Sequence, residues 1–264
     1  TGNEFAVEPA AKTFWYGLYG AVTAAVLWYR VITPIRLNLR HRMYVEAVIE
    51  ETPGIVSVLI GGRKLHRMGA EAGQFFRWRF KAPGMRFSSH PYSLSAAPRP
   101  DMLRITVKAI GDHSARLREL TPGTRVWAEG PYGALTAQRR SRGKVLLVAG
   151  GVGITPMRAL FETLPGASGD LTLLYRANST QELALWDELA RIADERGARL
   201  MYAVNSPDGE RPDISAESLS RKIPDVDRHD VFLCGPPGFA QSVYEALRGA
   251  GVPARRIHHE SFAM

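Results

Sequence analysis

The sequence predicts a small antiparallel β-barrel followed by a doubly wound parallel sheet, with an apolar helix in front of both. Over residues 43–140, short β-branched or aromatic runs are separated by Pro-Gly and Gly-Gly pairs, as is typical of antiparallel strands. Over residues 141–264, apolar runs alternate with amphipathic segments, which indicates a parallel sheet with helices on both faces. Residues 1–42 contain a long uncharged run and then a basic stretch. We therefore expect three parts with these boundaries: a helix with a basic linker, a barrel domain and an α/β domain.

The composition excludes several classes of protein. The 264 residues are 45% hydrophobic and 23% charged, as in globular chains rather than disordered ones. The formal net charge is +8, but the basic residues are spread along the chain, so we expect a solvated basic surface and no nucleic-acid partner. The single cysteine, Cys234, forms no disulfide within the chain and holds no iron–sulfur cluster alone. His258 and His259 have no third ligand nearby, so we expect no metal site.

The N-terminal run has the length of a membrane helix. Phe14–Tyr29 is uncharged, and after Arg30 the apolar character continues to Ile35, which gives about 20 residues, enough to cross a bilayer. Aromatic residues gather at both ends, as in the belts of membrane helices: Trp15, Tyr16 and Tyr19, then Trp28 and Tyr29. The basic stretch Arg36–Arg42 places that end on the cytoplasmic side. A buried helix of a soluble protein is the main alternative, because a signal peptide would need a small-residue cleavage site.

The expected elements follow from the same patterns. The barrel strands are Tyr44–Glu50, Ile55–Ile60, Gln74–Phe80, Tyr92–Ser95, Leu103–Lys108 and Arg125–Glu129, with a short helix over Ser114–Leu120. The strands of the α/β domain are Lys144–Ala149, Leu171–Tyr175, Arg199–Val204, Val231–Cys234 and Ile257–Glu260. Its helices are Pro156–Leu164, Gln181–Glu195, Ala216–Lys222 and Phe239–Ala250.

A glycine turn marks the nucleotide site of the α/β domain. Gly150–Pro156 reads Gly-Gly-Val-Gly-Ile-Thr-Pro and follows the apolar strand Lys144–Ala149 directly. A turn with so few side chains lets backbone N–H groups approach a diphosphate, and the helix that follows adds partial positive charge. Cys234 also falls at the carboxyl end of an expected strand, where ligands bind in open parallel sheets. The two segments therefore predict one shared dinucleotide site.

The stretch His90–Pro98, His-Pro-Tyr-Ser-Leu-Ser-Ala-Ala-Pro, is the most diagnostic in the chain. Together with Cys234-Gly-Pro-Pro it resembles the ferredoxin–NADP reductase superfamily, and within it the flavin domain of ferric reductases and NADPH oxidases. The resemblance implies that His90, Pro91, Tyr92 and Ser93 hold FAD, with Tyr92 flat on the isoalloxazine and the Ser93 hydroxyl near flavin N5. His90 stands where the wider superfamily has arginine. A plain β-strand after a proline turn is the alternative.

The same resemblance assigns the rest of the FAD site. Gly111 and Ser114 match the element that binds the FAD diphosphate, and Ser114 is also expected to cap the following helix. Lys108 adds charge there or is an ordinary solvated lysine. Phe262, near the end of the chain, would cover the flavin face on which the nicotinamide must land.

The resemblance likewise assigns an NADP site. Gly151, Gly153, Thr155 and Pro156 match the diphosphate loop, and Cys234, Gly235 and Pro236 would border the nicotinamide. Arg176 ends the second strand of the α/β domain, where NAD sites often place an acid, so we expect NADPH, with NADH possible. The alternative is that Arg176 is a surface residue. Ser93, Cys234 and Glu260 are the expected catalytic residues.

Taken together, these features predict a membrane-anchored, FAD-dependent oxidoreductase that transfers hydride from NAD(P)H to FAD and passes electrons onward singly. The resemblance implies a haem as their acceptor. The apolar run contains no histidine, so the haem is not in this chain, and we expect it in membrane helices preceding Thr1, with ferric iron or dioxygen beyond it. The expected location is a bacterial inner membrane, with the reductase domains facing the cytoplasm. Two alternatives stay open: a ferredoxin or flavodoxin reductase that uses a soluble carrier, and a non-catalytic flavin-binding module.

Overall fold

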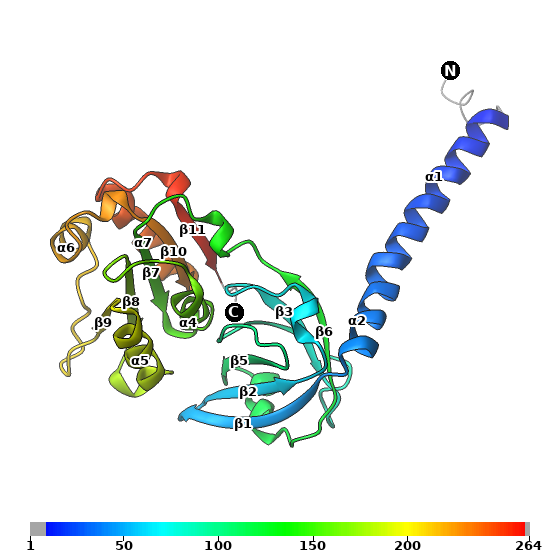
Figure 1. Ribbon diagram of the computed structural model, residues 1–264, viewed down its shortest axis with the longest axis horizontal. Coiled ribbons are helices and arrows are strands. Elements are labelled where there is room, and N and C mark those ends of the chain that lie inside the picture. Colours follow the sequence, from blue (N-terminus) through cyan, green and yellow to red (C-terminus); the bar gives the residue numbers. More distant parts are fainter. Residues whose placement is uncertain (1–8, 262–264) are drawn as a thin grey trace.

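The computed structural model describes residues 9–261, and its parts follow one another along the chain. A long helix stands apart from the rest, and a barrel lies between this helix and a layered α/β sheet (Figure 1). The expected order of elements, antiparallel strands followed by a parallel sheet, is therefore confirmed. Phe262 lies outside the described residues.

The N-terminal helix is continuous from residue 9 to residue 41 but changes its winding once. It consists of α1 (Pro9–Leu27), a π-helical turn (Trp28–Ile32) and α2 (Thr33–His41). The N–H of Thr33 donates to the carbonyl of Trp28, five residues back. Pro34 explains the wider turn, because a proline has no N–H to donate and its ring clashes with the carbonyl four residues before it. The helix ends at Arg42, whose φ of 47° is left-handed.

α1 is exposed along almost all of its described length. Within residues 9–261 one helical segment, Ala11–His41, is long and apolar enough, by length and composition, to cross a membrane, and none of its most apolar window is buried. Its large side chains are exposed, including Tyr16 at 76% and Tyr29 at 70%. An amphipathic helix of a soluble core would instead bury one face.

Asn38 attaches α2 to the barrel. Its amide is buried, with Nδ2 donating to the carbonyl of Ala128 at 2.9 Å and Oδ1 accepting from the N–H of Ala128 at 2.8 Å. This pair of bonds reproduces a strand pairing on the backbone of β6 (Val126–Tyr132). The direction of the apolar helix relative to the barrel is therefore fixed by α2 and not by α1.

The barrel is built from two three-stranded antiparallel sheets. Their orders are β1-β2-β5 and β4-β3-β6, and bridges from Tyr44 to Arg125 and from Leu94 to Ile105 close them into one ring. The strands are β1 (Tyr44–Thr52), β2 (Ile55–Gly61), β3 (Phe75–Phe80), β4 (His90–Ser93), β5 (Met102–Lys108) and β6. Alternate residues point inward, so that Phe76, Trp78 and Phe80 of β3 lie fully buried.

The α/β part is a five-stranded parallel sheet with the order β11-β10-β7-β8-β9. The strands are β7 (Val145–Gly150), β8 (Leu171–Ala177), β9 (Arg199–Val204), β10 (Asp230–Gly235) and β11 (Ile257–Ser261). α4 (Ile154–Thr163) and α5 (Trp186–Arg196) pack on one face, and α6 (Ala216–Lys222) and α7 (Pro237–Gly249) on the other. The strand order reverses between β7 and β10, and ligands bind at such a switch point.

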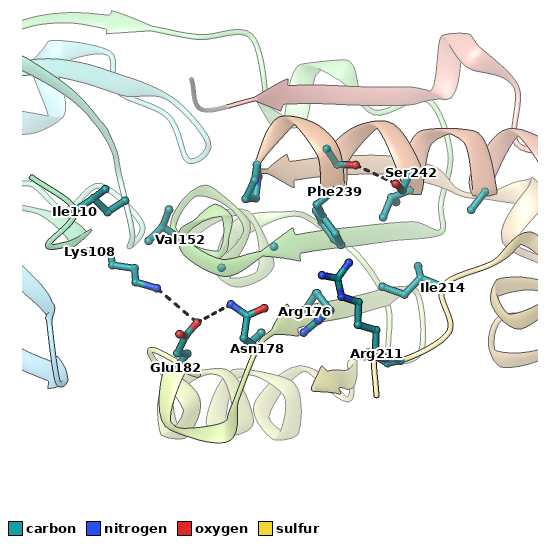
Figure 2. A pocket seen from close by; sticks show the side chains of 18 of the residues that line it. Lys108, Ile110, Val152, Arg176, Asn178, Glu182, Arg211, Ile214, Phe239 and Ser242 are labelled. Atoms are coloured by element: carbon teal, nitrogen blue, oxygen red, sulfur yellow. Dashed lines mark hydrogen bonds and ion pairs between the residues drawn. The ribbon is translucent and has the colours of Figure 1, made fainter. Parts of the chain in front are cut away.

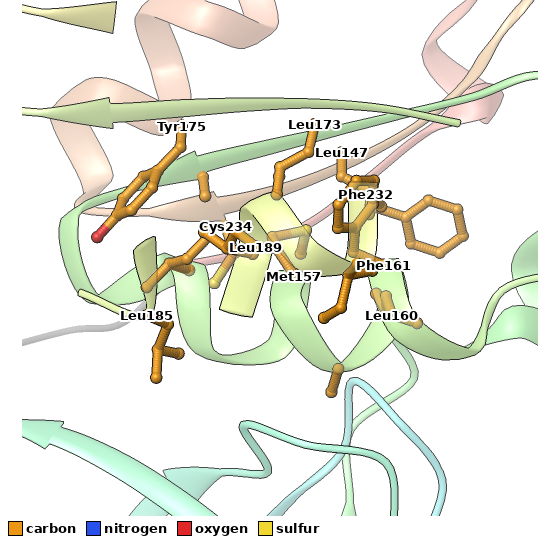
Figure 3. Close-up of a cluster of buried hydrophobic side chains, with 14 of the residues drawn as sticks. Leu147, Met157, Leu160, Phe161, Leu173, Tyr175, Leu185, Leu189, Phe232 and Cys234 are labelled. Atoms are coloured by element: carbon orange, nitrogen blue, oxygen red, sulfur yellow. The ribbon is translucent and has the colours of Figure 1, made fainter. Parts of the chain in front are cut away.

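The core under α4 and α5 is well filled. Phe161, Phe232 and Tyr175 are among its largest buried side chains, and Cys234 lies in the same cluster (Figure 3). The second core, under α6 and α7, holds Leu146, Leu233 and Leu247. Because both faces of the sheet are covered, β7 and β10 are apolar along their length, as expected for central parallel strands.

Several element boundaries differ from the sequence prediction, and three of these differences are the largest in the two domains. The helix expected to begin at Gln181 begins at Trp186, because Leu185 has a left-handed φ of 62° that no α-helix continues through. The helix expected over Ser114–Leu120 is α3 (Asp112–Ala115), which tightens into a 3₁₀ turn over Arg116–Glu119. β6 runs on to Tyr132, three residues beyond the expected Glu129.

Candidate active site

Two pockets meet where the barrel adjoins the carboxyl ends of the sheet strands. The first, here called the barrel pocket, has a volume of about 440 Å³ and lies against β4, β5 and α3. The second, here called the sheet pocket, has a volume of about 930 Å³ and lies over the glycine turn after β7 (Figure 2). The two share Lys108, Ile110 and Val152. Ligands held in them are therefore adjacent.

The barrel pocket has a wall of three rings. The ring centroids of His90 and His113 lie 3.8 Å apart with the two rings tilted by 31°, and the Tyr92 ring is inclined to them by 20° and 25°. The Tyr92 hydroxyl is 3.2 Å from Nδ1 of His113, within hydrogen-bond distance. Burial raises the pKa of Tyr92 to about 12, so this hydroxyl is neutral.

His113 is kept neutral by its surroundings. Burial, and then the positive charges of His90 and Arg116, lower its pKa to about 4. Its Nε2 is buried and has no hydrogen-bond partner within residues 9–261. Neutral rings that present a flat face are suited to an aromatic ligand.

Ser93 supplies a polar group to the same pocket. Its side chain is buried, and its Oγ makes no hydrogen bond to any residue that the structure describes. An unpartnered buried hydroxyl costs free energy, and a ligand that pairs with it recovers that loss. Ser93 therefore points to a polar ligand atom in the pocket.

Gly111 and Ser114 shape the far end of the barrel pocket. The Ser114 hydroxyl accepts bonds from the N–H groups of Ile110 and Gly111, both at 3.0 Å, and donates to the carbonyl of Gly111. Ser114 is thus the third residue of α3 and not its cap; the cap position is Gly111. Because α3 has only four residues, its dipole is small, and Ser114 fixes the loop through its hydroxyl.

Two glycines give the glycine turn its shape. Gly151 has a φ of +54°, and no atom lies within 4 Å of where its Cβ would stand, so its backbone is open to the sheet pocket. At Gly153 a Cβ would come within 2.2 Å of the carbonyl oxygen of Cys234. The turn can therefore lie directly on the end of β10 only with glycine at this position.

Two arginines lie on the floor of the sheet pocket. Arg176 donates to the carbonyl of Ala203 at 3.3 Å and to the side chain of Asn205, while Arg211 enters from the loop before α6 (Figure 2). Burial, and next the charge of Arg211, lower the pKa of Arg176 from its usual value. The two guanidinium groups repel each other, so an anion bound between them is stabilised.

Lys108 connects the two pockets. Its ammonium lies 3.5 Å from Glu182, whose carboxylate also accepts a bond from the amide of Asn178 at 3.3 Å. Lys108 comes from β5 of the barrel and Glu182 from the loop before α5, so the pair bridges the seam (Figure 2). Both side chains are more than a third exposed, so the pair contributes little to stability.

Cys234 and Glu260 lie beside these pockets and line neither. The Cys234 thiol is fully buried in the core under α4, and burial, with the charge of Glu260 second, raises its pKa well above the usual value. Glu260 pairs with Cys234 across β10 and β11 and accepts a bond from the N–H of Ala134 of the barrel at 3.3 Å. Burial raises the pKa of Glu260, and the N–H groups of Ala134 and Leu135 oppose that rise.

The structure brings most of the expected site residues together. The barrel pocket collects every described residue assigned to FAD: His90, Pro91, Tyr92, Ser93, Lys108, Gly111 and Ser114. The sheet pocket includes Gly151, Arg176 and Pro236, and Thr155 lines the barrel pocket instead. Gly153, Pro156, Cys234 and Gly235 line neither of the two: Gly153 belongs to the turn, Pro156 to α4, and Cys234 and Gly235 to the end of β10.

Among the pocket residues that were not singled out from the sequence, three bear on the shape or charge of the site. His113 lies within the Gly-x-x-Ser element that was assigned to FAD, so its place in that motif was the available signal. Phe239 lies in the first turn of α7. Its ring fills the space beside Gly150 and Gly235, so a larger residue at either glycine would collide with it. Arg211 lies in the irregular stretch before α6, where no periodic pattern marks it.

These residues fit the two expected cofactors. The barrel pocket offers flat aromatic rings and the unpaired Ser93 hydroxyl, as a flavin ring with polar edge atoms requires. The sheet pocket offers open backbone at Gly151 for a diphosphate and paired cations at Arg176 and Arg211 for a further phosphate.

Two protein-family models match separate parts of the chain. Residues 55–136 match the family model described as an FAD-binding domain, and residues 147–245 match the oxidoreductase NAD-binding domain. The chain is similar to the reductase subunit of a stachydrine N-demethylase from Rhizobium meliloti, at 33% identity over 80% of this chain and 64% of that protein. It is 31% identical to a flavohemoprotein from Xylella fastidiosa over 73% of this chain and 51% of that one. The chain thus spans less than two thirds of these relatives.

Among solved structures, the fold is similar to the FAD/NAD-binding domain of a nitric oxide dioxygenase from Vibrio cholerae. The TM-score is 0.69 and the sequence identity 28%, over 84% of this chain and 98% of that domain. The stretch before β1 falls outside both family matches.

Proposed function

We propose that this chain, which belongs to the NAD(P)H-dependent FAD oxidoreductases of the ferredoxin–NADP reductase-like fold, transfers hydride from NADPH to FAD and passes the electrons onward singly. One observation carries the proposal: the barrel pocket and the sheet pocket share Lys108, Ile110 and Val152, so their ligands are neighbours. Bound FAD supplies a two-electron acceptor that can release electrons one at a time.

The residues of the chain contribute mainly alignment. Tyr92 and the two histidines offer a flat wall for a ring, and Ser93 offers a hydroxyl that can hold a proton at the edge of that ring. Gly151 leaves room for a diphosphate close to the backbone of the turn. Holding two reactants in adjacent pockets replaces a chance encounter by a fixed geometry, which contributes several kcal/mol to catalysis in general.

Cys234 and Glu260 are proposed to act at the border of the nicotinamide position. The buried thiol is neutral, because its pKa is raised by burial and by Glu260, and it adds no charge beside the hydride path. Glu260 is half-buried with a raised pKa, which makes it the acidic group at the seam best suited to hold a proton.

NADPH is the proposed donor, with NADH as the weaker one. Support comes from Arg176 and Arg211, which lie together on the floor of the sheet pocket. The second strand of this sheet often ends in an acid that binds the ribose hydroxyl of NAD, whereas β8 ends with Arg176 and Ala177. Two cations favour a 2′-phosphate.

Residues 14–35 are proposed to anchor the enzyme in a bacterial inner membrane, with the barrel and sheet facing the cytoplasm. The support is the exposure of the whole apolar face of α1 and its aromatic residues at both ends. The electron acceptor is then a haem in membrane helices preceding Thr1, with ferric iron or dioxygen beyond it.

A separate protein as electron acceptor is the second candidate. The observation that favours it is the 33% identity to a protein described as the reductase subunit of a demethylase. In that case α1 only attaches the enzyme to the membrane surface, and a soluble carrier docks on the barrel side. Flavin reduction by NADPH is common to both candidates.

The test of the proposed function is anaerobic reduction of the FAD-loaded, detergent-purified chain. Adding NADPH is expected to bleach the visible absorption band of the flavin, and NADH to do so at higher concentration. If the band persists with both nucleotides while the FAD stays bound, the hydride step is contradicted. The chain would then be a non-catalytic flavin-binding module.

A further inference from the structure

A further cleft lies beside the C-terminal part of the apolar helix, away from both cofactor pockets. It has a volume of about 170 Å³ and runs between the start of α2 and the outer face of β3 and β6. Its polar lining comes chiefly from Arg30, Arg77, Arg79, Ser89 and Glu129. None of these residues lines the barrel pocket or the sheet pocket.

The alternation of β3 puts several cations on this outer face. Phe76, Trp78 and Phe80 point into the barrel, so Arg77, Arg79 and the next residue outward, Lys81, lie on the outside. Arg77 donates to the hydroxyl of Ser89 at 3.3 Å. Nε of Arg79 is buried and has no hydrogen-bond partner in the part of the chain that the structure describes.

The cleft has more positive than negative charge. Among its described lining residues Glu129 is the only acidic one, and its Oε1 already accepts a bond from the Tyr132 hydroxyl at 2.7 Å and lies 3.4 Å from Arg30. Arg77 and Arg79 therefore lack a carboxylate of their own in the cleft. A buried donor without a partner is a cost that an anion removes.

Lys81, next to the cleft, is also repelled by nearby positive charges. Its ammonium lies 4.6 Å from the centre of the Trp127 ring, and Trp127 is the cross-strand partner of Arg79. Burial, followed by the charges of Arg79 and Arg86, lowers the pKa of Lys81. The face therefore combines crowded cations with an indole, a side chain that favours the membrane interface.

The position of the cleft relative to the apolar helix is fixed. Asn38 holds α2 on the backbone of Ala128, so the cleft directly flanks the helix at its basic end, next to Arg30. In the membrane-anchored orientation, this is the depth at which lipid phosphates lie.

We propose that the cleft between α2 and β3–β6 binds the phosphate of an anionic phospholipid through Arg77 and Arg79. This inference rests on the membrane anchoring proposed above. The lipid neutralises the cations, fills the space beside Ser89 and holds the barrel at the membrane surface. Phosphatidylglycerol is the test lipid, because its headgroup is anionic and small.

The experiment titrates the detergent-purified, FAD-loaded chain with water-soluble dihexanoyl-phosphatidylglycerol in isothermal calorimetry. The expected affinity is at least about tenfold higher than for dihexanoyl-phosphatidylcholine or inorganic phosphate. Arg79→Ala is expected to weaken phosphatidylglycerol binding by about tenfold or more, since a charged hydrogen bond contributes about 1.5–3 kcal/mol. Arg118→Ala, which removes the same charge from an exposed position elsewhere on the barrel, is expected to leave binding unchanged.

Three results overturn the proposal. Equal binding of the two phospholipids removes the role of charge, and inorganic phosphate binding as tightly as phosphatidylglycerol makes the cleft a phosphate site. Equal losses in Arg79→Ala and Arg118→Ala mean that general charge, and not this cleft, attracts the lipid. Should Arg79→Ala fail to retain FAD, Arg77→Ala provides the same comparison.

The same samples keep this inference separate from the proposed function. Flavin reduction by NADPH in Arg79→Ala is expected to equal that of the wild type, because Arg79 lies outside both cofactor pockets. Normal reduction without selective lipid binding contradicts the lipid site alone. Selective lipid binding without flavin reduction contradicts the reductase function alone.

Discussion

At the scale of single residues, the site contains side chains that lack a hydrogen-bond partner or an opposite charge nearby. Ser93 has a buried hydroxyl without a hydrogen bond to any described residue, and Arg176 faces a second guanidinium, that of Arg211. His113 is a base held neutral beside another histidine. Each of these arrangements is unfavourable in the protein alone and becomes favourable when a ligand completes it.

The paired arginines predict nucleotide selectivity. Arg176→Ala and Arg211→Ala are each expected to raise KM for NADPH by about tenfold, or ~1.4 kcal/mol, because each removes a charged hydrogen bond to the 2′-phosphate. KM for NADH is expected to change by less than about twofold. Steady-state kinetics with both nucleotides provide the check, with Arg199→Ala, at the amino end of β9, as the control. Equal increases for NADPH and NADH would place the arginines elsewhere on the nucleotide.

His113 predicts a loss of stability in acid. Its pKa is about 4 in the folded protein and about 6.5 when unfolded, so the unfolded chain takes up a proton first as the pH falls. The stability from neutral His113 is complete above pH 6.5 and is lost as the pH falls toward 4. Because the ring is only partly buried, we expect a contribution of about 1 kcal/mol, or about 2–4 °C in Tm.

The check compares melting temperatures at pH 7 and pH 4.5. His113→Gln is expected to lose less Tm than the wild type over this interval, whereas His66→Gln, at an exposed position, is expected to follow the wild type. Parallel curves for all three proteins would mean that His113 titrates normally in the folded state.

The site residues expected from contiguous motifs mostly lie in or beside the two pockets, and their role there stays a prediction. The run from His90 to Ser93 and the glycine turn are contiguous, so the first could be matched to a family motif and the second to a strand–turn–helix pattern. Arg211 was not predicted as a site residue, because its position beside Arg176 depends on how an irregular loop returns to the sheet. Ser114 was expected to cap the helix that follows it, but it is the third residue of α3, and its hydroxyl bonds back to Ile110 and Gly111.

At the scale of elements, a charged cluster ties the barrel to the sheet domain. Arg104 of β5 contacts Glu188 of α5 at 2.6 Å, and Arg158 of α4 reaches the same carboxylate at 2.9 Å. Glu162 of α4 also accepts a bond from the N–H of Ala97 after β4, at 2.8 Å. Burial alone would raise the pKa of Glu188, but the bonds and charges of the two arginines lower it.

Removing Glu188 leaves two cations without their shared partner. Arg158 is only 4% exposed and Arg104 only 10%, so Glu188→Ala is expected to destabilise the protein by about 3 kcal/mol. Urea or thermal unfolding measures this, and flavin reduction should slow as the two domains lose their alignment. The control is Glu195→Ala, whose partner Arg191 is 57% exposed, and it is expected to unfold almost as the wild type does. Equal losses in the two variants would refute the role of the cluster.

Periodicity predicted which elements exist better than it predicted where they end. Apolar alternation located every strand of the barrel and the sheet to within a few residues, because burial on one or both faces is a local property of the pattern. The left-handed Leu185 and the π-helical turn before Pro34 carry weaker signals, since a leucine rarely adopts positive φ and a proline admits several helix distortions. Asn38 looks like a helix surface residue until β6 is placed beside it.

At the scale of the whole molecule, three parts meet at two junctions. The barrel adjoins the sheet at the cofactor pockets, and α2 joins the apolar helix to the barrel through Asn38 (Figure 1). The order of the parts was predictable from the sequence, since each has its own periodicity. Which faces of the three parts meet was not predictable from the sequence. The contacts at both junctions join residues far apart in the chain, such as Lys108 with Glu182 and Arg30 with Glu129.

Direct hydride transfer across the seam is the central claim, and single-turnover flavin reduction tests it most directly. The FAD-loaded protein is mixed anaerobically with NADPH or with NADPH deuterated at the transferred C4 position, and the flavin band is followed in stopped flow. We expect complete reduction by both, and a slower reduction with deuterium because a C–H bond breaks in the measured step. A flavin that remains oxidised with either nucleotide, although both cofactors bind, would contradict the account.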